Sequence, residues 1–228
     1  MRPTLAFDAD DTLWHNETHY AETQAAFRAL LRPFHDDVWI DARLHDTEMR
    51  NLRRYGYGIK GFTLSMIETA LELTEHRLDG AGIRAVLDLG KAMLDKPVEP
   101  LPGVAEVLGA LAGTYDLMLI TKGDLFDQET KLAKSGLGGH FAKVEIVSEK
   151  DEAAYAALLR RHGIRAAEFT MVGNSVKSDI LPVLALGGRA VHIPYHLTWA
   201  HEVVAIPGDC PFPSLESIRD LPALLGDW

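Results

Sequence analysis

The chain has few of the features that mark several large classes of protein. Its single cysteine, Cys210, excludes an intramolecular disulfide and suits a reducing compartment. No apolar run reaches the roughly 18 residues of a membrane span, and the stretch before Leu5 is too short for a signal peptide. Lys and Arg number 23 against 33 Asp and Glu, and this net charge of −10 argues against binding to nucleic acid or to an anionic membrane surface. We therefore expect a cytoplasmic protein.

The remaining composition is that of an ordinary globular protein. Of the 228 residues, 47% are apolar and 25% are charged, which is enough to bury a core in one large domain or in a domain with an insert. Cys210 has no basic neighbour in the sequence, which favours an inert loop thiol over a reactive one.

The most informative stretch lies near the N-terminus. Residues 5–7 are apolar, as is typical of a buried parallel strand, and Asp8, Asp10 and Asp11 follow directly. Crowding three carboxylates in a cleft is unfavourable without a positive partner, and carboxylate oxygens suit Mg²⁺. The alternative, from this stretch alone, is a solvated turn that caps a helix.

Residues 18–95 are predicted to be helical. Apolar residues recur at helical spacing around 25–31, 64–73 and 83–92, and no strand-like segment interrupts them. Three prolines between 97 and 102 then form a stiff linker. We interpret residues 16–96 as an inserted all-helical domain.

From residue 103 onward, helical and strand-like segments alternate. Helices are expected at about 103–112, 124–135, 151–162 and 177–186, and strands at 116–121, 143–147, 168–172 and 188–193. This alternation predicts an α/β fold, a doubly wound parallel sheet built from residues 1–15 and 97–228. The apolar residues of the tail at 202–228 are expected to pack against this core.

Polar residues that follow the predicted strands are expected to meet at one edge of the sheet. They are Asp8 and Asp10 after the first strand, Thr121, Lys122 and Gly123 at the second, Lys150 after the third, and residues 173–179 after the fourth. Each one alone is more simply a helix cap or a solvated charge. Together they indicate phosphoryl transfer.

This ordered set resembles the four motifs of the haloacid dehalogenase-like (HAD) hydrolase superfamily. Residues 8–12 resemble the first motif, Thr121 the second, Lys150 the third and residues 173–179 the fourth. The helical block lies where that superfamily inserts a helical cap. The resemblance implies a Rossmann-like core with a cap, and a phosphatase that acts on a small phosphorylated metabolite.

The resemblance also implies a role for each matching residue. Asp8 would be the nucleophile that forms an aspartyl-phosphate, and Asp10 the acid that protonates the leaving oxygen and then, as a base, activates water. Mg²⁺ would be held by Asp8, Asp179 and the backbone carbonyl of Asp10. Thr121 and Lys150 would complete the catalytic set and bind the phosphate together with Lys122 and Gly123.

Asn174 departs from the family pattern, because the fourth motif often opens with Gly-Asp. Its amide oxygen suits a Mg²⁺ ligand or a partner for metal-bound water, with Asp179 as the dominant ligand. The alternative is a loop residue in the left-handed conformation.

Asp10 favours phosphate ester hydrolysis over dehalogenation, because a halide leaves without a proton. The alternatives left open are a phosphomutase, a 2-haloacid dehalogenase and an inactive binding module. The oligomeric state and the particular phosphate ester are not determined by the sequence.

Two weaker features carry hypotheses of their own. Residues 53–61 combine aromatic, basic and glycine residues, and form either a loop over the substrate or an exposed connection between helices. His192, His196 and His201 lack a supporting cysteine and standard zinc spacing, which favours structural histidines over a zinc site. Trp14 is expected to serve packing.

Overall fold

A computed structural model describes residues 2–206, 208 and 212–228 of the chain. Cys210 lies outside the described residues, so the prediction of an inert thiol is not addressed by the structure.

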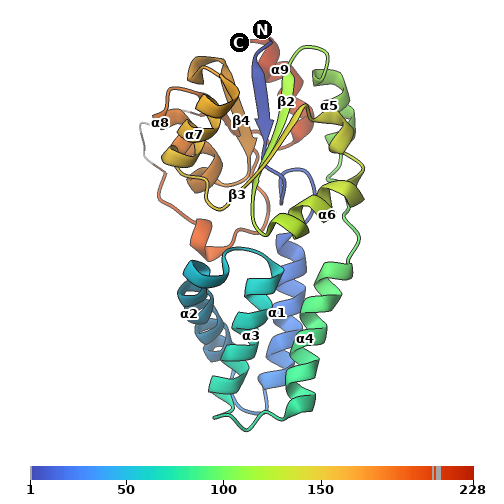
Figure 1. Cartoon of the computed structure of the whole chain (residues 1–228), viewed down its shortest axis with the longest axis vertical. Helices are drawn as coiled ribbons and strands as arrows, with labels where there is room; N and C mark the ends of the chain where they lie inside the picture. Colours follow the sequence, from blue (N-terminus) through green and yellow to red (C-terminus); the bar gives the residue numbers. More distant parts are fainter. Residues whose placement is uncertain (1, 207, 209–211) are drawn as a thin grey trace. The chain divides into compact units, whose positions relative to one another are not determined.

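The chain divides into two compact units (Figure 1). The α/β unit comprises Met1–Glu17, Val98–Lys122 and Glu129–Trp228, and the helical unit comprises Thr18–Pro97 and Gly123–Gln128. The predicted boundaries instead place residues 123–128 in the α/β core. The first of them, Gly123, is the last residue of the predicted phosphate-binding segment, so the chain leaves the α/β unit after Lys122 as well as after Glu17.

The α/β unit is built on a five-stranded sheet in which every neighbouring pair of strands is parallel. The strands, in order across the sheet, are β3 (Lys143–Val147), β2 (Asp116–Lys122), β1 (Thr4–Phe7), β4 (Phe169–Gly173) and β5 (Arg189–His192). The chain runs outward from β1 through β2 to β3 and returns to β4 and β5 on the other side. Ligands bind open sheets at such a reversal, beyond the carboxyl ends of the strands. The predicted doubly wound sheet is confirmed.

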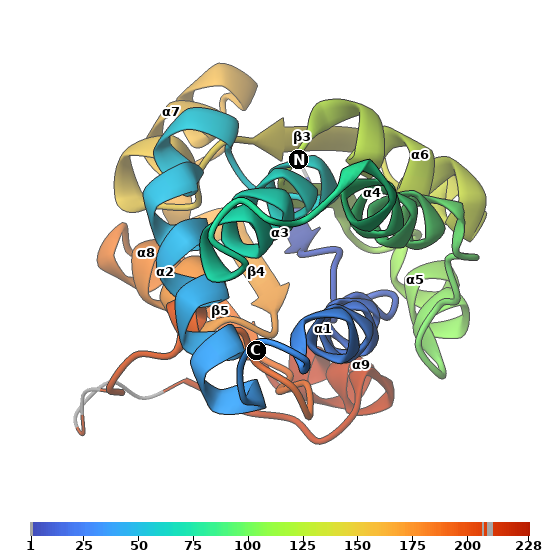
Figure 2. The same cartoon turned by 90° about the horizontal axis from the view of Figure 1, so that it is seen from below.

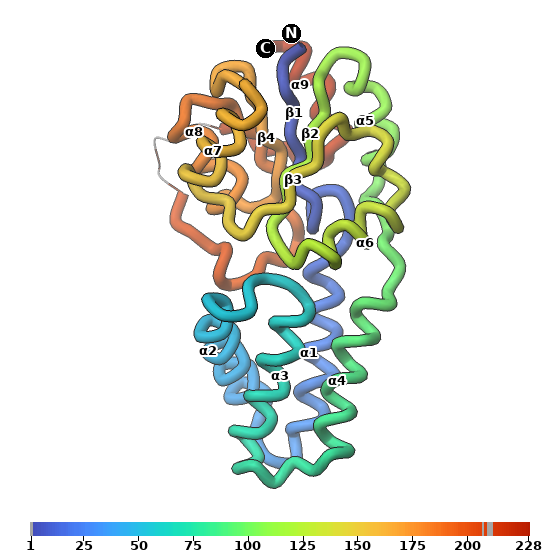
Figure 3. The backbone as a smooth tube through the Cα atoms, viewed as in Figure 1, coloured from blue at the N-terminus to red at the C-terminus, as the bar shows by residue number. Residues whose placement is uncertain are grey.

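Side chains that alternate along the strands bury both faces of the sheet. Leu5, Leu117 and Val172 belong to one apolar cluster, and Ala6 and Met118 belong to the other. The first cluster is completed by α5 (Val104–Leu111) and α9 (Leu221–Gly226), and the second by α7 (Glu152–His162) and α8 (Leu181–Ala185). Figure 3 traces these helices on the two sides of the strands. The buried residues of α9 confirm that the tail packs against the core.

Within residues 18–97, the helical unit contains four helices rather than the three apolar segments that the sequence predicts (Figure 2). They are α1 (Glu17–Leu31), α2 (Asp37–Tyr55), α3 (Ile59–Leu73) and α4 (Gly80–Asp95). The missed helix is α2, whose buried face consists of Ile40, Leu44, Thr47 and Asn51. Two of these four side chains are polar, so the helix has no apolar repeat strong enough to be recognised.

The segment at residues 53–61 is mostly helical and is not a long loop. Residues 53–55 end α2, residues 56–58 connect the helices, and α3 begins at Ile59. Lys60 Nζ lies 2.8 Å from Asp124 Oδ1, which belongs to the same unit. A role for residues 53–61 in contacting the substrate stays a prediction.

The prediction of an α-helix at 177–186 is wrong for the first half of that range. Residues 176–180 form a wide π-helical turn, and α8 begins only at Leu181. Pro182 lies in the first turn of α8. Because proline lacks an N–H and its ring clashes with the preceding turn, it fits this position better than a helix interior.

Among the described residues, no helix combines the length and the hydropathy needed to cross a membrane.

The core of the α/β unit gives a first testable prediction. Leu108 on α5 is fully buried against the sheet. We expect Leu108→Ala to lower the free energy of unfolding by about 3 kcal/mol, because it removes buried apolar area and leaves a cavity. Urea denaturation measures the loss. The control is Leu30→Ala, at a side chain that is 39% exposed. A loss at Leu108 no larger than that of the control would contradict this description of the core.

Candidate active site

Asp8 lies where β1 ends, beside β4. Its backbone N–H donates to the carbonyl of Val172 over 2.9 Å, which extends the pairing of the two strands past Phe7. The side chain is buried, and its Oδ2 accepts a hydrogen bond from Thr12 Oγ1 at 3.0 Å. The position of this carboxylate is therefore determined by the two central strands.

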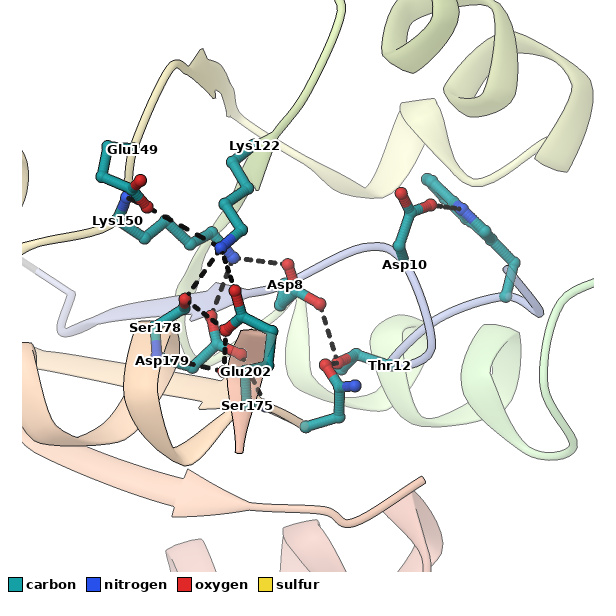
Figure 4. Close-up of polar contacts among 12 residues, drawn as sticks. Asp8, Asp10, Thr12, Lys122, Glu149, Lys150, Ser175, Ser178, Asp179 and Glu202 are labelled. Atoms are coloured by element: carbon teal, nitrogen blue, oxygen red, sulfur yellow. Dashed lines mark hydrogen bonds and ion pairs between the residues drawn. The ribbon is translucent and has the colours of Figure 1, made fainter. Parts of the chain in front are cut away.

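Lys150 bridges two aspartates (Figure 4). Its ammonium donates to Asp8 Oδ1 and, over 2.8 Å, to Asp179 Oδ1. All three side chains are at least nine-tenths buried. Asp8 and Asp179, which are far apart in the sequence, thus share one cation.

Gly173 allows Asp179 to approach β4 closely. A Cβ atom at position 173 would lie 2.2 Å from Asp179 Oδ2, so any side chain there would displace the carboxylate. The same oxygen accepts from the backbone N–H of Ser175 at 3.0 Å. The run that the sequence analysis matches to the fourth motif therefore folds tightly around one carboxylate.

The centre carries more negative than positive charge. Burial raises the pKa of Asp8 to about 7; the Lys150 ammonium opposes this shift, and the Asp179 carboxylate adds to it. Burial disfavours the ammonium of Lys150, but the charges of Asp179 and Asp8 outweigh burial and raise the pKa of Lys150. Two carboxylates around one ammonium leave a charge that a further cation would neutralise.

The residues at this centre fit a hard divalent cation. Asn174 Oδ1 lies 3.3 Å from Thr12 Oγ1, whose hydroxyl donates to Asp8, so an amide oxygen stands close to the carboxylates. The candidate metal ligands Asp8, Asp179 and Asn174 all offer oxygen atoms, which Mg²⁺ prefers. Within residues 2–206, 208 and 212–228, no three His, Cys, Asp or Glu side chains are grouped to hold a metal. Amide, backbone or water oxygens would have to complete the coordination. Asn174 is not in the left-handed conformation.

Asp10 lies in a separate cluster of hydrogen bonds. Its Oδ1 accepts from Trp14 Nε1 at 2.7 Å, and Lys131 Nζ lies 3.1 and 3.0 Å from its two oxygens. Lys131 also donates to Asn16 Oδ1 at 2.8 Å. Trp14 is fully buried, as expected for a packing role. Its ring nitrogen also contacts Asp10, the residue predicted to act first as an acid and then as a base.

Asp11 caps a helix, which is the role that the alternative interpretation gave to the whole acidic stretch after the first strand. It adopts a left-handed conformation, with φ of 63°, and its carboxylate accepts from the backbone N–H groups of Asn16 and Glu17. It thereby caps the start of α1. Of the three aspartates, Asp8 and Asp10 remain for chemistry.

Thr121 and Lys122 end β2, the strand beside β1. Thr121 is buried, whereas the ammonium of Lys122 contacts Ser178 Oγ at 3.0 Å and pairs with Glu202. Gly123 follows with φ of 152°, a backbone conformation that other residues rarely adopt. The charge of Lys122 is thus paired with the carboxylate of Glu202. The role of Lys122 as a phosphate ligand stays a prediction.

Glu202 is a site residue that the sequence analysis missed. Its Oε2 accepts from Ser175 Oγ at 2.5 Å and from Ser178 Oγ at 2.6 Å. It thus links the end of β2 to the turn that carries Asp179. Lys131 was also missed, because a lone lysine on a helix carries no pattern that sets it apart from a solvated charge.

The three histidines have partners other than one another. The ring nitrogens of His192 lie 3.1 Å from the carbonyl of Asn174 and 3.1 Å from Ser214 Oγ. His201 Nε2 lies 3.2 Å from Lys177 Nζ, and the His196 ring contacts Tyr195. These contacts account for the rings within the protein.

The doubly wound sheet and the acidic centre beyond its strands define an α/β enzyme fold. A family model described as haloacid dehalogenase-like hydrolase matches residues 3–187, and the chain belongs to this family of hydrolases. No curated protein matches the chain.

Solved structures agree with this assignment. A haloacid dehalogenase-like family hydrolase from Xanthomonas campestris is 41% identical, covers 99% of this chain and 91% of its own, and has a TM-score of 0.86. A 2-haloacid dehalogenase from Pseudomonas syringae, at 21% identity, a TM-score of 0.67 and 100% coverage of both chains, shares the fold. So does a predicted phosphoglycolate phosphatase from Haemophilus somnus, at 15% identity, a TM-score of 0.63 and 98% coverage of both chains.

The carboxylate of Glu202, whose side chain is 11% exposed, gives a prediction about stability and pH. Burial alone would raise its pKa, but the charge of Lys122 and hydrogen bonds from Lys122, Ser175 and Ser178 hold the pKa at about 2. Because this pKa lies below that of an unfolded glutamate, the carboxylate stabilises the fold above pH ~4.5, and the contribution disappears as the pH falls toward ~2.

We therefore expect Glu202→Gln to cost about 2 kcal/mol at pH 7, with the difference from wild type closing on acidification. Urea denaturation across this pH range measures it. Glu149→Gln is the control, because Glu149 is half-exposed and lies 3.7 Å from the same ammonium. An equal cost at all pH values would contradict the assignment.

Proposed function

We propose that this hydrolase is a Mg²⁺-dependent phosphatase that cleaves a small phosphate monoester through an aspartyl-phosphate on Asp8. The observation that carries the proposal is the pair formed by a buried carboxylate bridged to Lys150 and a second carboxylate, Asp10, two residues further on. Asp10 is 22% exposed and has its own cation. In the proposed mechanism, Asp8 attacks phosphorus and Asp10 moves protons.

In the first half of the proposed reaction, an oxygen of Asp8 attacks phosphorus and the bond between phosphorus and the ester oxygen breaks. Asp10 donates a proton to the departing alkoxide. Lys150 holds Asp8 in place, and its charge offsets that of the incoming phosphate, while Thr121 and Gly123 lie at the strand end where the phosphate oxygens would bind. In the second half, water attacks phosphorus, Asp10 accepts its proton, and Asp8 is released with inorganic phosphate.

Mg²⁺, when bound, would neutralise the negative charge of the phosphoryl group as Asp8 approaches it. The residues that would hold it are Asp8, Asp179, Asn174 and the backbone carbonyl of Asp10. The two buried carboxylates on the single Lys150 ammonium support this proposal, because their charges exceed that of the one lysine.

The alternative within the family is cleavage of a carbon–halogen bond. A halide leaves without a proton, so that reaction gives no task to a second carboxylate held beside a lysine. The cluster around Asp10 therefore favours a substrate whose leaving group is an alkoxide. The partner that we propose is a small phosphorylated metabolite.

Replacing the nucleophile tests the mechanism. Asp8→Asn removes the attacking oxygen anion, and we expect it to lower the turnover of p-nitrophenyl phosphate by more than about 10³-fold. The assay is run with MgCl₂ and with EDTA, and halide release from 2-chloropropionate is measured alongside. Asp46→Asn, at an exposed position on α2, serves as the control. Full activity of Asp8→Asn, or halide release in place of phosphate release, would refute the proposal.

Changing the charge at residue 174 tests the metal site. We expect Asn174→Asp to tighten Mg²⁺ binding by about 10-fold, because affinity for hard cations rises with the number of charged ligands. The readout is the Mg²⁺ concentration that gives half-maximal activity. An unchanged value would mean that residue 174 is remote from the ion.

A further inference from the structure

We propose that Lys131 is a positioning residue that holds the Asp10 carboxylate for the second half of the reaction, the hydrolysis of phosphorylated Asp8. This inference rests on the proposed function and adds to it a residue outside the matched motifs. For a substrate whose leaving group needs no proton, it assigns the contribution of Lys131 to the second chemical step.

The contacts of Lys131 are those of a side chain built to hold a carboxylate. Its ammonium lies 3.1 and 3.0 Å from the two oxygens of Asp10, and it donates to Asn16 Oδ1 at 2.8 Å. Trp14 Nε1 donates to Asp10 Oδ1 at 2.7 Å. Two different side chains thus donate to one carboxylate, and a rotation of the carboxylate would break at least one of these hydrogen bonds.

Burial makes this arrangement more than a surface ion pair. The side chain of Lys131 is 12% exposed and that of Asp10 is 22% exposed. Exposed pairs contribute little because water screens them, whereas a pair this sheltered holds its geometry. Lys131 projects from α6 (Leu125–Ser135) and the Trp14 ring is fully buried, so both donors stand on ordered parts of the α/β unit.

The donors around Asp10 suit its role as a base. In the second half-reaction the water oxygen bonds to phosphorus, one water proton passes to Asp10, and the bond from phosphorus to the Asp8 oxygen breaks. Asp8 becomes a carboxylate again, inorganic phosphate leaves, and Asp10 keeps the proton for the next alkoxide. An ammonium that contacts both oxygens of Asp10 stabilises the carboxylate and aims it at the water.

The choice of substrate separates the two half-reactions. A nitrophenolate leaves without a proton, so phosphorylation of Asp8 by p-nitrophenyl phosphate does not depend on Asp10. Hydrolysis of the aspartyl-phosphate still requires a base. A defect in Asp10 positioning must therefore appear in the second step alone.

The experiment compares the full-length protein with Lys131→Met on this substrate in the presence of Mg²⁺. We expect kcat and KM to fall together by about 10- to 100-fold, as for the loss of a residue that orients a catalytic group, while kcat/KM stays near that of wild type. A burst of nitrophenolate close to the enzyme concentration and an acid-stable phosphoenzyme are expected. Lys131→Arg should restore part of kcat, because it keeps the charge.

The matched control is Lys134→Met, an exposed lysine on the same helix, which should keep the wild-type kcat. An unchanged kcat in Lys131→Met would overturn the inference, as would a fall in kcat/KM without phosphoenzyme. If Lys131→Met does not fold, judged by circular dichroism, Lys131→Gln takes its place in the same tests. A wild-type protein that neither forms a phosphoenzyme nor releases phosphate would refute the proposed function itself, which is a separate outcome.

Discussion

The structure depends on the burial of two aspartates around one lysine. Neither carboxylate could stay out of water alone, because an unpaired buried charge costs several kcal/mol. Lys150 offsets part of that free energy by pairing with both carboxylates. The backbone N–H of Ser175 and the hydroxyl of Thr12 stabilise the carboxylates further by donating to their other oxygens. What is left is an excess of negative charge, because two carboxylates share one ammonium. A fold that keeps such an excess at the ends of its central strands is prepared for a positively charged ligand.

The acidic residues fall into two centres with different charge. Asp8, Asp179 and Lys150 sum to a negative charge, whereas Asp10 and Lys131 sum to zero. A negative centre attracts a cation, and a neutral pair does not compete with it. Two aspartates only two residues apart are thus given separate environments, which is how one protein can assign them separate tasks. Asp11, which caps α1, has a third environment and no chemical task.

The sequence predicts the sheet and most of the centre, because both depend on local patterns. Apolar runs mark the strands, and the carboxyl ends of parallel strands must meet at one edge, so Asp8, Lys150 and Asp179 could be placed together. The α2 helix escaped because its buried face includes Thr47 and Asn51. Lys131 and Glu202 escaped because each acts through contacts with residues distant in the sequence, at Asp10 and at Ser175, and nothing around them in the sequence marks those partners.

The π-helical turn at residues 176–180 has a consequence for how this chain can vary. A π turn accommodates one more residue than an α turn, and each residue advances a helix by about 100°, so the length of the segment determines the direction in which Asp179 points. Exchanging the side chain of Lys177, which is half-buried and contacts His201, leaves that spacing unchanged. A deletion of one residue would swing the carboxylate away from Lys150. The direction of the Asp179 carboxylate is thus more sensitive to a change in the length of this segment than to a change of its side chains.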